Sequence, residues 1–162
     1  MIALKNILVA TDFSEPSNVA LNYGRDMARA YGARLHVLHV VDDVLAHYSP
    51  EAGLISDQLQ KDLEQMAWRD LEGQITADDQ RSLTVIPAIE TNVGAASGIV
   101  DYAKTHAIDL IITGTHGRGA MKHLLMGSVA ERVVRIAPCP VLTVHAGERE
   151  FIAPDAMCAV VA

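Results

Sequence analysis

A glycine-rich segment, GTHGRGAMKHLLMGS over residues 114–128, has residue types and a spacing that could bind phosphate. Gly114 and Gly117 could adopt positive φ or leave backbone N–H groups pointing into a concavity, which suits phosphate oxygens. After nine intervening residues, Gly117 is followed by Gly127 and Ser128, where a missing side chain and a hydroxyl could close the other side of the concavity. The structural alternative stays open, because glycines also end strands and allow close helix packing.

Basic residues gather around this segment although the chain as a whole is acidic. The formal net charge is −7, whereas residues 114–135 hold four basic residues and one acidic residue, a local charge of +3. The basic residues are Arg118, Lys122, Arg132 and Arg135. This reversal of sign favours a multiply charged anion. The acidic balance of the whole chain argues against a general nucleic-acid binder, whose affinity comes mostly from Lys and Arg.

Groups that could perform catalysis are few in this segment. The six residues 114–119 are followed by Ala120 and Met121, so the lysine of a P-loop is absent, and no G-x-G-x-x-G follows the first apolar run. His116 and His123 could touch phosphate or act as a base, although an isolated histidine is more often structural. Ser128 lacks a G-x-S-x-G elbow. The pattern favours holding a nucleotide over cleaving it.

Composition predicts one domain with an aliphatic core. The chain has 162 residues, of which 50% are hydrophobic but only 4% aromatic. Cys139 and Cys158 form no zinc spacing and no C-x-x-C. No apolar run resembles a secretory signal or a membrane span, so we expect a cytoplasmic location.

Short β-branched runs alternate with longer segments at helical period, which predicts an α/β fold with an open parallel sheet, right-handed crossovers and helices on both faces. The expected strands are residues 6–10, 34–41, 82–89, 109–114 and 140–144. The expected helices are residues 14–31, 56–71, 95–106 and 121–135. Ser14 is the expected N-cap of the first helix, and the second helix is expected to place Leu59, Leu63, Met66 and Leu71 on one side.

Ligands of open parallel sheets bind beyond the carboxyl ends of the strands, where the strand order reverses. If the first strand is central, the loops after the first and fourth strands line that crevice. These loops are ATDFSE, residues 10–15, and GTHGRG, residues 114–119. Two specialised segments that are distant in sequence are therefore expected to meet.

The chain resembles the universal stress proteins of the UspA family. Gly114, Gly117, Gly127 and Ser128 meet the family pattern of G-x-x-G, nine residues and G-[ST]. ILVATDFSE, LHVVD, DLIITGTHGRG and LLMGSVAERVVRIAPCPVLTV also match, over residues 3–145. The resemblance implies five parallel strands in the order 3-2-1-4-5, a Rossmann-like fold of the adenine nucleotide alpha hydrolase type. It divides the chain into a domain of residues 1–145 and a tail of residues 146–162.

The resemblance also implies a site for ATP or another adenine nucleotide, bound together with magnesium, and assigns residues to it by position. Asp12 could bind a ribose hydroxyl or help to hold the magnesium ion, and a local cap of the next helix is the plainer alternative. Ala10 stands where some ATP-binding relatives have proline. The implied site consists of Ala10, Thr11 and Asp12 beside the nucleoside, Val40 by the adenine, Thr113, Gly114, Gly117 and Arg118 at the ribose and phosphates, and Gly127, Ser128 and Val129 at the phosphate tail.

By the same resemblance the protein is a homodimer paired through its last strand, Val141 to Val144, an arrangement that would cover an apolar edge. The function that follows is a nucleotide-dependent regulatory dimer in stress response, acting on an unidentified protein partner. Two alternatives remain: a slow ATPase or self-phosphorylating enzyme, and an interaction module without nucleotide. The apolar tail, residues 146–162, is either a frayed end or a segment docked on a subunit or partner.

Overall fold

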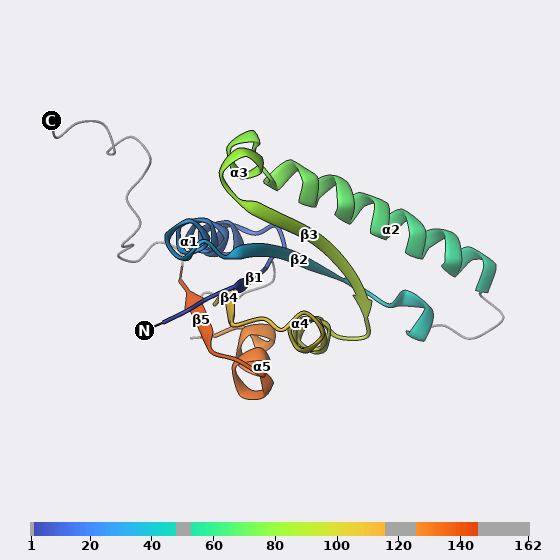
Figure 1. Cartoon of the computed structure of the whole chain (residues 1–162). Helices are drawn as coiled ribbons and strands as arrows, with labels where there is room; N and C mark the ends of the chain where they lie inside the picture. Colours follow the sequence, from blue (N-terminus) through green and yellow to red (C-terminus); the bar gives the residue numbers. More distant parts are fainter. Residues whose placement is uncertain (1, 48–52, 116–125, 146–162) are drawn as a thin grey trace, which may run out of the picture.

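Five parallel strands form one sheet in the order β3-β2-β1-β4-β5 (Figure 1). The computed structural model describes residues 2–47, 53–115 and 126–145. The strands are β1 (Asn6–Ala10), β2 (Arg34–Asp42), β3 (Thr84–Asn92), β4 (Leu110–Gly114) and β5 (Val141–Val144). Both the parallel sheet and the strand order agree with the sequence-based expectation. The expected tail, residues 146–162, lies outside the described residues.

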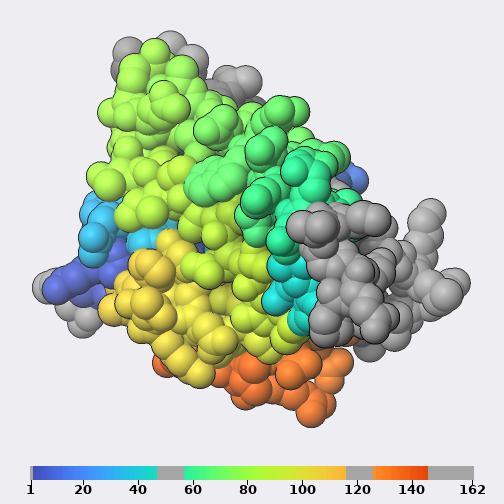
Figure 2. All heavy atoms as spheres, turned by 90° about the vertical axis from the view of Figure 1, so that its right-hand side faces the viewer, coloured from blue at the N-terminus to red at the C-terminus, as the bar shows by residue number. Residues whose placement is uncertain are grey.

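Helices cover both faces of this sheet, as predicted (Figure 1). On one face lie α1 (Glu15–Tyr31), α2 (Gly53–Gln74) and α3 (Ala77–Ser82); on the other lie α4 (Ala95–Thr105) and α5 (Ser128–Ile136). Figure 2 shows α4, in yellow, directly beside α5, in orange. Alternate residues of the fully buried strand β1 enter the two cores, Ile7 and Val9 toward α1, and Leu8 and Ala10 toward α4. No helix in the described ranges is long and apolar enough to cross a membrane.

The first helix closely follows its prediction. Ser14 is the N-cap residue, with extended backbone, although its side chain does not cap the helix. Pro16 lies in the first turn, where its missing N–H costs no helical hydrogen bond. Gly32 ends the helix with φ of 63°, a left-handed conformation that glycine adopts without steric cost.

The second helix differs from its prediction in length and in the face that it buries. It extends over Gly53–Gln74, beyond the expected 56–71, and a short 3-10 helix, η1 (Val44–His47), precedes it. Leu59 and Met66 are 42% and 59% exposed, so the expected inner stripe is wrong at these positions. Gln60 and Ala67 are buried with Leu71 instead. Gln60 is accommodated because its side-chain oxygen accepts a hydrogen bond from Val44 N at 3.0 Å.

One helix was not predicted, and the starts of β3 and of the last helix differ from their predictions. Helix α3 was missed, and β3 begins at Thr84 and not at residue 82, because the chain is still helical through Ser82. The expected helix of residues 121–135 begins at Ser128, since Met126 is a bend and Gly127 is the N-cap with φ of −71° and ψ of 151°. Residues 121–125 of that prediction lie outside the described part of the chain.

Candidate functional site

The loops after β1 and β4 meet at the reversal of strand order, as predicted. β1 lies between β2 and β4, and Ala10 is in register with Leu38 on one side and Thr113 on the other. The contact between the loops is direct, because a Cβ built on Gly114 would lie 2.9 Å from the Cβ and carbonyl carbon of Pro16. The crevice expected at the carboxyl edge of the sheet is therefore bordered by these two segments.

Gly114 owes its identity to helix packing at this point. No substituent fits between the end of β4 and the first turn of α1, and the opposing atoms include backbone of Pro16. Gly32 is the one glycine with positive φ in the described ranges, so the left-handed conformation considered for Gly114 is not adopted. The structural interpretation of this glycine is therefore supported, because its missing side chain lets the end of β4 approach the first turn of α1.

The two ends of the glycine-rich segment are joined by backbone hydrogen bonds. Gly127 N donates to Thr115 O at 2.6 Å, and Thr115 N donates to Val144 O at 2.8 Å. Gly114 and Gly127 therefore lie near one another in space, although thirteen positions separate them in the sequence. Gly117, Arg118, His116 and His123 lie outside the described residues, so their predicted roles stay predictions.

The start of α5 presents backbone donors at this place. Gly127 is its N-cap and supplies no side-chain hydrogen bond, and the first helical bond runs from Glu131 N to Gly127 O at 2.9 Å. The N–H groups of Ser128, Val129 and Ala130 precede that bond, so they lack acceptors within the helix. The helix dipole adds a partial positive charge at the same end. Ser128 and Val129 are exposed, which leaves this end accessible to an anion.

The positive charge near α5 is smaller than the sequence count indicates. Arg135 pairs with Glu131 at 2.9 Å, one helical turn earlier and on the exposed surface. Arg132 forms no ion pair with the described residues, so it is the cation of α5 that remains for a ligand.

The loop after β1 is held by its own side chains. Asp12 Oδ1 accepts hydrogen bonds from the backbone N of Ser14 at 3.1 Å and from its hydroxyl at 2.5 Å. This carboxylate therefore holds the turn into α1 through its bonds to the N-cap residue, Ser14. Phe13 has φ of 65°, a conformation that is uncommon for a bulky side chain and worth noting beside a candidate site.

The Thr11 hydroxyl lies on the face of the sheet that α1 and α2 cover. Its Oγ1 lies 3.1 Å from Ser17 Oγ and donates to Gln74 Oε1 at 3.2 Å, on the side of α1 and α2. The same oxygen accepts a hydrogen bond from Phe13 N at 3.0 Å. The hydroxyl of Thr11 is thus engaged, while its carbonyl contacts His39 Nδ1 at 2.8 Å.

The apolar positions of the implied site share the face that α4 and α5 cover. Ala10 belongs to the core on that face, and Val40 packs against it. Val40 lies so near α4 that a Cβ on Gly98 would be 2.8 Å from its Cγ1. Thr113 alternates with Ile112, which enters the opposite core, so Thr113 belongs to the same face as Ala10. The structure therefore brings Ala10, Val40 and Thr113 to the face that also holds the start of α5.

A buried histidine, His36, lies outside the candidate site. His36 Nδ1 is 2.9 Å from the Tyr102 hydroxyl of α4, and burial, together with the charges of His106 and Arg34, lowers the pKa of His36 to about 4. His39, three positions later, contacts the Phe13 ring at 4.5 Å between centroids, so the two histidines lie on opposite faces of the sheet. Within the described ranges, no group of three His, Cys, Asp or Glu residues could hold a metal ion.

Comparisons with known proteins identify the family. Residues 3–145 match the model described as the universal stress protein family. The chain belongs to the universal stress protein family. Universal stress protein MJ0531 of Methanocaldococcus jannaschii is 29% identical over 157 residues, covering 90% of this chain and 85% of that protein. Universal stress protein UspA from Lactobacillus plantarum has a TM-score of 0.80 and 27% identity, covering 89% of this chain and 99% of that one.

The universal stress protein fold also occurs in two more distant structures that contain nucleotides. A universal stress protein in complex with cAMP is 23% identical, with a TM-score of 0.61 over 89% of this chain and 98% of that one. The protein from Archaeoglobus fulgidus in complex with dAMP is 20% identical, with a TM-score of 0.61 over 89% of this chain and 99% of that one. At this identity both similarities establish the shared fold.

Proposed function

We propose that the protein binds an adenine nucleotide in the crevice between the β1 loop and the start of α5, and that its occupancy regulates a dimer in stress response. The observation that carries the proposal is the start of α5. Its first N–H groups, which have no acceptor within the helix, lie where the strand order reverses, beside the end of β4. Ligand binding changes a partner's affinity when it favours one of two states of the protein.

The adenine preference rests on the relatives. Two proteins of this fold bind cAMP and dAMP, which share an adenine, a ribose-type sugar and one phosphate group. ATP, the ligand implied by the glycine pattern, has the same adenine, a ribose and two phosphates more. Arg132, which forms no ion pair with the described residues, and the adjacent N–H groups suit those additional charges.

The residues present fit such a ligand when each is given the role that its environment allows. Ala10 and Val40 supply an apolar wall for the adenine, and Ser128 and Val129 supply N–H donors for phosphate. Asp12 contributes a carboxylate for a ribose hydroxyl or for a magnesium ion that phosphate oxygens also coordinate. Thr11 contributes only by its position at the end of β1, because its hydroxyl is engaged on the face of α1 and α2 and its N–H donates to Leu38 O at 2.9 Å. Gly117 and Arg118 complete the proposed set.

Binding without rapid turnover is the favoured form of this function. The sequence of the glycine-rich segment contains neither the lysine of a P-loop nor a G-x-S-x-G elbow at Ser128. Slow ATP hydrolysis and self-phosphorylation at Ser128 are the enzymatic alternatives. An interaction module without nucleotide is the third.

The proposed dimer pairs the last strands of two chains. β5 is an edge of the sheet, and its sequence VLTV contains neither a charge nor a proline that would discourage pairing. At the other edge, β3 contains Pro87, which has no N–H to donate to a further strand, and Glu90 adds a charge. The β5 edge is therefore the better candidate for association with a second copy.

The test is the identity and stabilising effect of bound nucleotide. Nucleotide released on denaturation should contain adenine, and ATP with Mg²⁺ at a hundred times its dissociation constant should stabilise the fold by about 2.7 kcal/mol. The double variant Gly127→Val, Ser128→Ala should lose this thermal shift and remain dimeric. Gly94→Val is the matched control, because Gly94 is the N-cap of α4 at the same sheet edge, and a Cβ there meets no atom within 4 Å.

The outcomes separate the three alternatives. Absence of both eluted nucleotide and thermal shift at millimolar ATP would leave the interaction module. Phosphate release over hours by the wild type, lost in the double variant, would identify an ATPase. Label transferred from γ-labelled ATP to the protein would identify self-phosphorylation.

A further inference from the structure

A second cleft lies on the face of the sheet opposite the proposed nucleotide site. It has a volume of about 620 Å³ and lies between α1 and α2, near the start of α3. Small-molecule sites commonly have volumes of this order and combine apolar walls with a few polar groups. Phe13 and Leu21 supply apolar surface, and the remaining lining is mostly polar.

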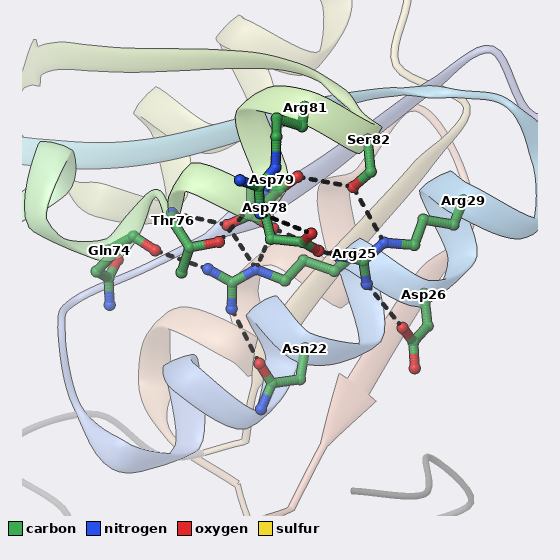
Figure 3. Close-up of polar contacts among 10 residues, drawn as sticks. All are labelled: Asn22, Arg25, Asp26, Arg29, Gln74, Thr76, Asp78, Asp79, Arg81 and Ser82. Carbon is green, nitrogen blue, oxygen red and sulfur yellow. Dashed lines mark hydrogen bonds and ion pairs between the residues drawn. The ribbon is translucent and has the colours of Figure 1, made fainter. Parts of the chain in front are cut away.

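One wall of the cleft is a fixed polar network (Figure 3). Arg25 Nε donates to both carboxylate oxygens of Asp79, at 2.9 and 3.0 Å, while Nη1 donates to Asn22 Oδ1 at 2.9 Å and Nη2 to Gln74 O at 2.6 Å. The Arg25 charge is balanced by Asp79, whose side chain is 3% exposed. Arg25 therefore builds the wall and leaves the binding of an anion to other residues.

The polar groups that remain available in the cleft are mainly donors. Asn22 and Asn18 each use the side-chain oxygen as an acceptor, from Arg25 and from Gln74 Nε2, and their amide nitrogens bond to no described residue. Arg69 also lines the cleft, and it forms no ion pair or hydrogen bond within the described ranges. Donors without acceptors beside an apolar surface suit a ligand with a carboxylate and an apolar body.

We propose that this cleft binds a small organic acid, whose carboxylate accepts hydrogen bonds from Arg69, Asn18 and Asn22 while its apolar body lies against Phe13 and Leu21. Asp70 lies at the same rim and is exposed. An ammonium group on the ligand would find a partner in Asp70, so an α-amino acid has the same carboxylate chemistry with one additional contact. The site differs in face, lining and ligand chemistry from the nucleotide crevice.

Gly73 allows the cleft to be filled without disturbing the fold. It lines the cleft within α2, and a Cβ built on it meets no heavy atom within 4 Å. Gly73→Leu therefore places a side chain in open space, and leucine has a higher helix propensity than glycine. The expected melting temperature is unchanged or higher, so loss of binding in this variant cannot be attributed to unfolding.

The experiment titrates the full chain with phenylacetate and, separately, with phenylalanine, following backbone amide shifts by NMR. Saturable shifts are expected in the β1 loop, α1 and the end of α2. Gly73→Leu should abolish them, and Arg69→Gln should weaken binding about tenfold, the loss expected for a charge-assisted hydrogen bond. Lys61→Gln, on the same helix but outside the cleft, should bind as the wild type does.

Tighter binding of phenylalanine than of phenylacetate would indicate an additional contact between the ligand ammonium group and Asp70. Equal binding would indicate that the cleft recognises the carboxylate alone. Either result supports the proposal. Absence of saturable shifts with both probes at millimolar concentration would overturn it, as would equal binding by the wild type and Gly73→Leu.

Discussion

The polar network between α1 and α3 and the crevice at the start of α5 contain similar groups. The network pairs them within the fold, whereas the crevice leaves them available for a ligand. At α3, Thr76 Oγ1 accepts from Asp79 N, Asp79 accepts from Thr76 N, and Arg25 completes the cluster, so each charge has its partner within the chain (Figure 3). At α5 the N-cap is a glycine and no described side chain caps the helix. Polar groups that satisfy one another stabilise a fold, whereas donors left without acceptors can serve a ligand.

The largest effect is expected from breaking the closed network. Asp79→Ala leaves the guanidinium of Arg25 without its carboxylate in a site where Arg25 is only 16% exposed, and removes half of the capping box. Loss of one partner of a buried pair commonly costs about 3–5 kcal/mol in unfolding free energy. Chemical denaturation would measure it. Asp78→Ala is the matched control, because Asp78 is 63% exposed and its pair with Arg29 should contribute at most about 1 kcal/mol.

Acid should weaken the same network in a defined direction. Burial alone would raise the pKa of Asp79, but hydrogen bonds from Arg25 and Thr76 outweigh it and hold the pKa below its ordinary value of 3.8. The ionised form is thus favoured by folding, so its contribution is complete above the ordinary pKa and is lost as pH falls through the folded-state value.

The second prediction concerns a closed pair on the other face, His36 and Tyr102. Because the folded-state pKa of His36 is about 4 against an ordinary 6.5, the unfolded chain binds the proton first, and stability should fall between pH 6.5 and 4. The full loss approaches about 3 kcal/mol for a shift of this size. Unfolding free energies measured across this range, and a His36→Leu variant with a flatter profile, would check it. A His36 resonance titrating near 6.5 in the folded protein would contradict it.

The third prediction tests the junction of the two loops. Gly114→Ala introduces a Cβ against the Pro16 backbone, which must shift, and overpacking of this kind typically costs about 1–3 kcal/mol. The melting temperature should fall and nucleotide affinity should fall with it, because the crevice is bordered by the displaced segments. Gly94→Ala meets no atom and should change neither quantity. Equal stability of the two variants would show that the loops are not in contact.

The connectivity of the chain explains which features of these two regions could be predicted from the sequence. Alternating runs predict the strands and the meeting of residues 10–15 with 114–119, because parallel strands bring their carboxyl ends to one edge. Helix α3 was missed although Thr76 and Asp79 have capping-box spacing, since its six residues, ADDQRS, show no apolar period. Its partner Arg25 is 54 positions away, beyond the reach of any local pattern. The role of Gly114 likewise depends on Pro16, a neighbour only in space.

The smallest effect on stability is expected at the open end, and it would be the sharpest test of the contrast. Ser128 is exposed and no hydrogen bond of its side chain to a described residue holds it, so Ser128→Ala should change the unfolding free energy by less than about 0.5 kcal/mol. If its hydroxyl bonds a phosphate, the same change should weaken nucleotide binding about tenfold or more. Calorimetric titration beside denaturation would separate the two quantities. Substitution of a residue that shapes both the fold and the crevice should lower stability and affinity together, as Gly114→Ala should; substitution of a residue left available for a ligand should lower affinity alone. Unchanged nucleotide affinity would remove the Ser128 hydroxyl from the site and leave the backbone donors of α5 to hold the phosphate.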